Sequence, residues 1–227
     1  MVKYSAFLRA LIQVIILLTA AVILSACGTG SQPGEPSTGD VYSGETTDSE
    51  VEIPSGVAPA ISSLAGAAGA NYQIVNERQA VLDLVNQARC ASNLNPLVLN
   101  DKLSKAAELH SVDMAINEFF SHTSATTGST PSQRITAQQY SWWTVGENIA
   151  AGYDTLEGVF EGWMASPGHK ANILNPNFRE MGLGHVVFDN PAARKLPNYV
   201  HWWTQTFGTQ WSQKDTPANP TCDDLGL

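Results

Sequence analysis

The chain has 227 residues, enough for one domain with a substantial core. It carries 21 acidic and 12 basic residues, and its formal net charge is −9. This acidity favours solubility and argues against nucleic acid and anionic lipid headgroups as partners.

Residues 1–26 have the pattern of an export signal. Lys3 and Arg9 precede an apolar run from Leu11 to Leu24, which has the length of a signal peptide core and is short for a membrane span. The sequence Leu-Ser-Ala-Cys ending at Cys27 is similar to a bacterial lipobox, which predicts lipidation of Cys27 and attachment to a membrane. An ordinary cleaved signal and an uncleaved anchor are the alternatives, and all three place the domain outside the cytoplasm.

Residues 27–70 differ in composition from everything that follows. Gly, Ser, Thr, Pro, Asp and Glu dominate, and no lysine or arginine occurs between Cys27 and Arg78. Such a segment buries too little apolar surface to offset the entropy of ordering it. We therefore predict a disordered acidic tether over 27–70, a folded domain over 71–211 and a C-terminal tail over 212–227.

The first half of the domain shows helical spacing. We expect a helix after Asn76 with Val81 and Val85 on its buried face, and a second helix that starts at Asn100 or Asp101. His110 falls on the apolar stripe of the second helix, where a core histidine with a backbone partner is the favoured interpretation. Further helices are predicted to begin at Thr130-Pro131, Thr155 and Ser166-Pro167.

Strand patterns dominate the second half. The segments 181–188 and 199–207 are predicted to be antiparallel strands, and a third strand is expected near 143–149. Helices followed by an antiparallel sheet predict an α+β domain. The tryptophan pairs Trp142-Trp143 and Trp202-Trp203 would place one ring on each sheet face. We interpret them as core, with sugar or lipid binding as the alternative.

Three ionisable residues stand out beside apolar neighbours: His122, Glu147 and His169. His169 lies in the first turn of the helix after Ser166-Pro167, where the positive helix end favours neutral imidazole. Glu147 lies in a stretch expected to pack, so its carboxylate needs hydrogen bonds or a cationic partner.

The order of the motifs resembles the CAP superfamily, the cysteine-rich secretory, antigen 5 and pathogenesis-related proteins, and most closely its bacterial branch. The motifs that carry the resemblance are Leu109–Met114, Phe120–Thr123, Gly146–Ala150, Trp163–His169, Asn172–Leu174 and Trp203–Gln205. The resemblance covers roughly Val75 to Phe207. It implies an α-β-α sandwich in which a central three-stranded antiparallel sheet lies between helical layers.

The resemblance also implies a cleft lined by His122, Glu147 and His169. The family's second glutamate is expected at the position of Ser166, so one carboxylate is missing here. Two imidazoles and one carboxylate match the ligand count of an open site for a divalent cation such as zinc. Glu161 and His185 are candidate substitutes for the missing carboxylate.

Three functions follow as expectations. The leading one is a surface-tethered protein, expected to be a monomer, that binds a small molecule, a lipid, another cell-envelope component or a cation at this cleft. The second is a hydrolase or peptidase that uses the same groups with Ser166, although no Gly-x-Ser-x-Gly elbow and no His-Glu-x-x-His motif is present. The third is a purely structural envelope protein.

The cysteine count, like the predicted export signal, is consistent with a location outside the cytoplasm. If Cys27 is lipidated, Cys90 and Cys222 remain, and an oxidising compartment allows them to pair. Such a bond would tie the C-terminal tail to the first helix. Two separate thiols are the alternative.

Overall fold

The computed structural model describes residues 40–43, 72–188, 196, 199–217 and 220–227. The predicted signal peptide, Cys27 and most of the predicted tether lie outside these residues, so their roles stay predictions. In the described part of the chain, the elements are β1 (Asp40–Ser43), β2 (Tyr72–Val75), α3 (Arg78–Ala91), β3 (Val98–Leu99), α4 (Asp101–Asn117), α5 (Pro131–Ala137), β4 (Trp142–Ala151), α6 (Leu156–Ala165), α7 (Pro167–Ile173), β5 (Glu180–Phe188) and β6 (His201–Gln210), with 3-10 turns at Trp211–Gln213 and Asp223–Leu225.

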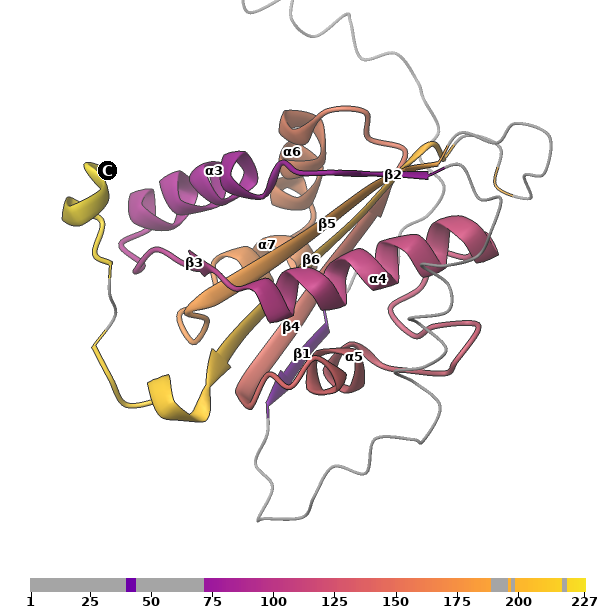
Figure 1. Cartoon of the computed structure of the whole chain (residues 1–227). Coiled ribbons are helices and arrows are strands. Elements are labelled where there is room, and N and C mark those ends of the chain that lie inside the picture. Colours follow the sequence, from indigo (N-terminus) through magenta and orange to yellow (C-terminus); the bar gives the residue numbers. More distant parts are fainter. Residues whose placement is uncertain (1–39, 44–71, 189–195, 197–198, 218–219) are drawn as a thin grey trace, which may run out of the picture. The chain divides into compact units, whose positions relative to one another are not determined.

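One mixed sheet organises these elements (Figure 1). Its strand order is β1-β4-β6-β5-β2, all antiparallel, and β3 adds a short parallel pairing to β5. The three predicted strands are β4, β6 and β5, which form the centre of the sheet. The sheet is wider than the three strands expected, because β1, β2 and β3 extend it at both sides.

Helices cover both sheet faces, which confirms the α-β-α sandwich. On one face, α4 lies so close to β5 that a Cβ atom added to Gly182 or Gly184 would overlap the α4 backbone. On the other face, α3, α6 and α7 contribute Val81, Trp163 and Ile173 to one buried apolar cluster with strand residues. Alternation along each strand therefore divides the core into two layers.

The two longest helices start differently. Asn100 caps α4 as predicted, since its side chain accepts hydrogen bonds from the backbone N–H groups of Lys102 and Leu103. The predicted cap of α3 at Asn76 is wrong. Glu77 is the N-cap residue and makes no side-chain cap bond, because its carboxylate instead accepts a hydrogen bond from His185 Nδ1 at 2.8 Å.

Four residues of the predicted tether are ordered as a strand. Asp40–Ser43 form β1 and pair with β4, which differs from the disorder expected for this segment. The described helices include none whose length and apolar character would suffice to cross a bilayer.

The predicted disulfide is present. Cys90, near the end of α3, is bonded to Cys222, with a Cα–Cα distance of 5.8 Å. This bond ties the C-terminal tail, which contains the 3-10 turn Asp223–Leu225, to the helical layer that includes α3.

Trp202 and Trp203 are both core residues, as favoured from the sequence. Both are almost completely buried, Trp202 in the layer next to α4 and Trp203 in the layer next to α3 and α6. Trp142 and Trp143 are half-buried.

Candidate functional site

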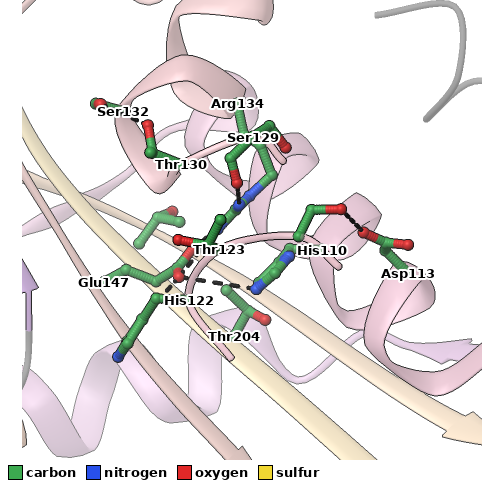
Figure 2. A network of polar contacts seen from close by, with 12 residues as sticks. His110, Asp113, His122, Thr123, Ser129, Thr130, Ser132, Arg134, Glu147 and Thr204 are labelled. Atoms are coloured by element: carbon green, nitrogen blue, oxygen red, sulfur yellow. Dashed lines mark hydrogen bonds and ion pairs between the residues drawn. The ribbon is translucent and has the colours of Figure 1, made fainter. Parts of the chain in front are cut away.

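Glu147 is the centre of a buried polar network (Figure 2). It lies in the middle of β4 and is 1 % exposed. One Nη atom of Arg134 donates to both carboxylate oxygens, at 3.0 and 2.8 Å. Burial by itself raises the pKa of Glu147, but the charge of Arg134 and the adjacent imidazoles outweigh burial and lower the pKa to about 2. The carboxylate is therefore ionised and acts only as an acceptor.

His122 is the first imidazole in contact with this carboxylate. Its Nδ1 lies 3.0 Å from Glu147 Oε1 and donates to it, since an ionised carboxylate has no proton to give. In the neutral ring, Nε2 then carries the lone pair. Figure 2 shows this second nitrogen directed away from Glu147. His122 is buried, and its contact with Glu147 holds the ring in one orientation.

His110 is a second imidazole beside Glu147 that we did not assign to the site from sequence. Its Nε2 donates to the Ser121 carbonyl at 2.9 Å, which confirms the predicted core histidine with a backbone partner. The same nitrogen lies 3.9 Å from Glu147 Oε1. Burial, and then the charge of Arg134, lower the pKa of His110 to about 3, so the ring is neutral.

Arg134 is the residue that sequence reasoning missed. It lies on the seven-residue helix α5, which Thr130 begins with a complete capping box. Arg134 is 2 % exposed, and it also donates from its other Nη atom to the Ser129 carbonyl at 2.8 Å. The only signal in the sequence was the requirement that a buried Glu147 needs a cationic partner, and this requirement did not say which of the basic residues supplies it.

Asp113 holds the loop that follows His122. Its carboxylate accepts from Ser124 Oγ at 2.6 Å and from Thr126 Oγ1 at 2.9 Å. Asn117, on the same helix, donates to it at 2.8 Å. Because Asp113 is itself 1 % exposed on α4, these bonds fix the loop to a rigid helix and restrict the position of His122.

His169 approaches β4 from α7. Pro167 is the first residue of α7 and Ser166 is its N-cap, as predicted, although the Ser166 side chain makes no cap bond. Asn148, the neighbour of Glu147, donates to the His169 carbonyl at 3.1 Å, and Asn172 donates to the Glu147 carbonyl at 3.1 Å. Burial, and then the adjacent His122, lower the pKa of His169 to about 4.

The candidate substitutes for the missing carboxylate are placed elsewhere. Glu161 is exposed on α6. His185 bonds to Glu77 and, through Nε2, to His201 Nδ1 at 3.0 Å. It alternates along β5 with Gly184, which faces α4, so His185 lies in the other core layer.

The arrangement of these side chains limits which of them could bind a metal ion. Among the described residues, no group of three or more His, Cys, Asp or Glu side chains is arranged to hold a metal ion. Both oxygens of Glu147 already accept hydrogen bonds from Arg134, and one also accepts from His122. Glu147 is therefore suited to orient the imidazole of His122 and not to bind a metal itself. Carboxylates commonly have this role next to metal-binding histidines.

The fold is an α-β-α sandwich, and on its strand β4 the carboxylate of Glu147 contacts His122 and lies 3.9 Å from His110. The family model described as CAP, the cysteine-rich secretory protein family, matches residues 82–207. This is more than half of the chain, and the chain therefore belongs to this family.

Similar proteins are found in bacteria. The chain is 44 % identical over 106 residues to the uncharacterized protein YkwD of Bacillus subtilis, and 35 % identical over 139 residues to the uncharacterized membrane protein YlbC of the same organism. The matches cover 47 % and 61 % of this chain, but only 41 % and 36 % of those proteins. The chain thus spans well under half the length of these relatives.

Solved structures agree on the fold. An extracellular protein containing an SCP domain from Bacillus anthracis matches with a TM-score of 0.51 at 32 % identity, over 59 % of this chain and 40 % of that one. An outer surface protein from Borrelia burgdorferi matches with a TM-score of 0.50 at 24 % identity, over 61 % of this chain and 98 % of that one.

Proposed function

We propose that this chain is a membrane-anchored CAP-domain protein of the cell envelope that binds a ligand through His122 and His169. A divalent cation such as zinc is the simplest ligand of matching chemistry, because neutral imidazole is a common zinc ligand. The remaining coordination positions would be left to water, a small molecule or a group of another envelope component. This assignment makes the protein a binding module, with no catalytic step ascribed to Ser166.

The contact between Glu147 and His122 is the observation that carries the proposal. A hydrogen bond from Nδ1 to a fixed carboxylate sets the ring orientation and raises the basicity of Nε2, which is the role that carboxylates commonly play behind metal-binding histidines. The pKa of His169 is lowered to about 4, so this second ring is neutral at pH 7 and needs no deprotonation before it binds a cation.

Zinc titration of the full chain tests the proposal. The tag-free protein in detergent would compete with a chromophoric chelator at pH 7.5, alongside His122→Ala, His169→Ala and Glu147→Gln. We expect each histidine variant to lose the site and Glu147→Gln to bind about 10–100-fold more weakly. His201→Ala is the matched control, because it removes a histidine that bonds to His185 instead of Glu147. Equal zinc uptake by the wild type and both histidine variants would favour a purely structural role.

The predicted export signal supports this location, and so does the similarity to an extracellular protein, an outer surface protein and a membrane protein. Two acyl chains are needed for stable anchoring, and a lipidated N-terminal cysteine can supply them. We expect Cys27→Ala to move the protein from the membrane fraction to the soluble fraction and to abolish incorporation of a labelled fatty acid. Retention of the variant in membranes without label would instead indicate an uncleaved anchor.

A further inference from the structure

The helix that carries His169 cannot fix its own position. α7 has only seven residues, and a helix this short is not stable in isolation. Ser166, its N-cap residue, makes no side-chain cap bond to the first turn. Contacts with the rest of the fold must therefore determine where α7 lies, and with it the place of His169 relative to β4.

Two buried asparagines bond α7 to β4 through the main chain of the site residues. Asn148, which follows Glu147 on β4, donates to the carbonyl of His169 at 3.1 Å. Asn172, about one turn after His169 on α7, donates to the carbonyl of Glu147 at 3.1 Å. The two side chains also bond to each other, from Asn172 Nδ2 to Asn148 Oδ1 at 2.9 Å. Each site residue is thus held by an amide that belongs to the segment of the other.

The two amides use all of their donor capacity in this network. The second N–H of Asn148 donates to Gln205 Oε1 on β6 at 3.1 Å, so Nδ2 of each asparagine makes two hydrogen bonds. All three side chains are completely buried. An apolar residue in place of either asparagine would leave a buried polar group of its partners unpaired, which costs more than a satisfied hydrogen bond contributes. The network therefore favours one arrangement of α7 on the sheet.

The opposite end of α7 is also held. Arg89 of α3 is buried, and one of its Nη atoms donates at 2.8 Å to the carbonyl of Ile173, the last residue of α7. The segment after α7 packs against β4, since a Cβ atom added to Gly146 would lie 2.7 Å from the Phe178 ring. These contacts restrict sliding of α7, and the asparagine pair sets its register on β4.

We propose that Asn148 and Asn172 are positioning residues of the cation site, and that they set the place of His169 relative to β4. They act through the main chain. One holds the first turn of α7, and the other holds β4 at Glu147, whose carboxylate contacts His122. This inference rests on the proposed function, because it assigns the asparagine pair to the same site.

Zinc competition by the full chain at pH 7.5 tests the inference with Asn148→Ala and Asn172→Ala. Asn172→Ser, which keeps a small polar group, is the milder variant if an alanine variant does not fold. Asn86→Ala is the matched control, because Asn86 is also a buried amide with two main-chain bonds. It donates to the Leu97 carbonyl at 3.0 Å and accepts from the Leu97 N–H at 2.8 Å, which joins α3 to the segment before β3.

We expect both site variants to bind zinc about 10–100-fold more weakly than the wild type, as is usual when a supporting residue of a metal site is removed. Asn86→Ala should lose a similar amount of stability in urea but bind zinc like the wild type. A merely structural role of the asparagine pair would give the same zinc affinity in all folded variants. Hydrogen exchange of the backbone amides of α7 should be faster in the site variants than in the control.

Failure of this inference is distinguishable from failure of the proposed function. Zinc binding by the wild type, with unchanged affinity in Asn148→Ala and Asn172→Ala, would overturn the inference alone, and so would an equal loss of affinity in Asn86→Ala. Absence of zinc binding by the wild type would overturn the proposed function. In that case, exchange of α7 that is no faster in the site variants than in the control would overturn the inference as well.

Discussion

A negative charge at Glu147 is tolerated inside the sheet because Arg134 sits against it. Neither side chain has appreciable contact with water, and the Arg134 guanidinium donates to both carboxylate oxygens. Removing one partner of such a pair leaves an uncompensated buried charge, which costs far more than the net contribution of the pair itself. At the residue scale, the site is therefore a stability element as well as a means of orienting His122.

Loss of Arg134 alone should be strongly destabilising. We expect Arg134→Met to lower the free energy of unfolding by about 3–5 kcal/mol, because Glu147 would remain buried without its cation. Adding Glu147→Gln to this variant removes the stranded charge and should restore part of the loss. Urea denaturation of the wild type, both single variants and the double variant provides the double-mutant cycle. Simple additivity of the two changes would contradict the coupling described here.

The residues of the site were predictable to different degrees. His122, Glu147 and His169 stand in motifs whose order resembles a family, so they could be named from the sequence. His110 was assigned correctly to the core, but its contact with Glu147 depends on where α4 passes the sheet, which spacing alone does not give. Arg134 could not be identified, since nothing local distinguishes a buried arginine on a short helix from an exposed one.

At the element scale, the close approach of α4 to β5 decides how the two layers meet. Gly182 and Gly184 leave room for the α4 backbone, and Ser111 on α4 donates to the Gly184 carbonyl at 3.0 Å. This contact fixes the height of α4 over the sheet. It thereby fixes His110 and Asp113, which α4 carries into the site.

A methyl group at position 184 tests this contact. A Cβ atom there would lie 2.4 Å from the backbone nitrogen of Glu108, which no side-chain rotation can relieve. We expect Gly184→Ala to lower the free energy of unfolding by about 1–3 kcal/mol, the usual cost of overpacking. An unchanged urea midpoint would show that α4 can move away from the sheet without loss.

Long elements were predicted well and short pairings were not. The strands β4, β5 and β6 have strong β patterns, and Asn100 is a typical helix cap, so their positions followed from local sequence. β1, β2 and β3 have two to four residues, too few to show a period, and they exist because a neighbouring strand offers an edge. The N-cap of α3 is Glu77 instead of the predicted Asn76. Here too a long-range contact matters, because Glu77 is hydrogen-bonded to His185, which is far away in the sequence.

The disulfide acts at the scale of the whole molecule, because it closes a loop of 132 residues between α3 and the tail. Cross-linking such distant residues restricts the unfolded chain more than the folded one. We expect Cys90→Ser with Cys222→Ser to lower the free energy of unfolding by about 2–4 kcal/mol, measured by urea denaturation. Reduction of the wild type should give the same shift. A reduced wild type as stable as the oxidised protein would contradict a stabilising role.

Stability should also fall in mild acid. Burial lowers the pKa of His110 to about 3, of His169 to about 4 and of His185 to about 3. In the unfolded chain histidine titrates near pH 6.5, so below that pH the unfolded state binds more protons and gains free energy relative to the folded state. For His110 alone the loss between pH 6.5 and pH 5 is about 2 kcal/mol. Glu147 acts in the same direction at lower pH, since its pKa is lowered.

Urea denaturation at pH 7.5 and pH 5.0 measures this dependence. The free energy of unfolding should be constant above about pH 7 and should decrease steadily below pH 6.5. His110→Gln should have a smaller slope than the wild type, whatever its absolute stability. A free energy of unfolding that increases when the pH is lowered from 7.5 to 5.0 would contradict the inference that the buried imidazoles are neutral.

The orientation of His122 by Glu147 is most directly tested by the ¹⁵N chemical shifts of its imidazole ring at pH 7. The predicted tautomer of the neutral ring has a protonated Nδ1 and an unprotonated Nε2, and Nε2 alone should shift when zinc is added. Glu147→Gln should weaken the preference for this tautomer. A neutral ring protonated at Nε2 instead of Nδ1 would contradict the orientation of His122 by Glu147.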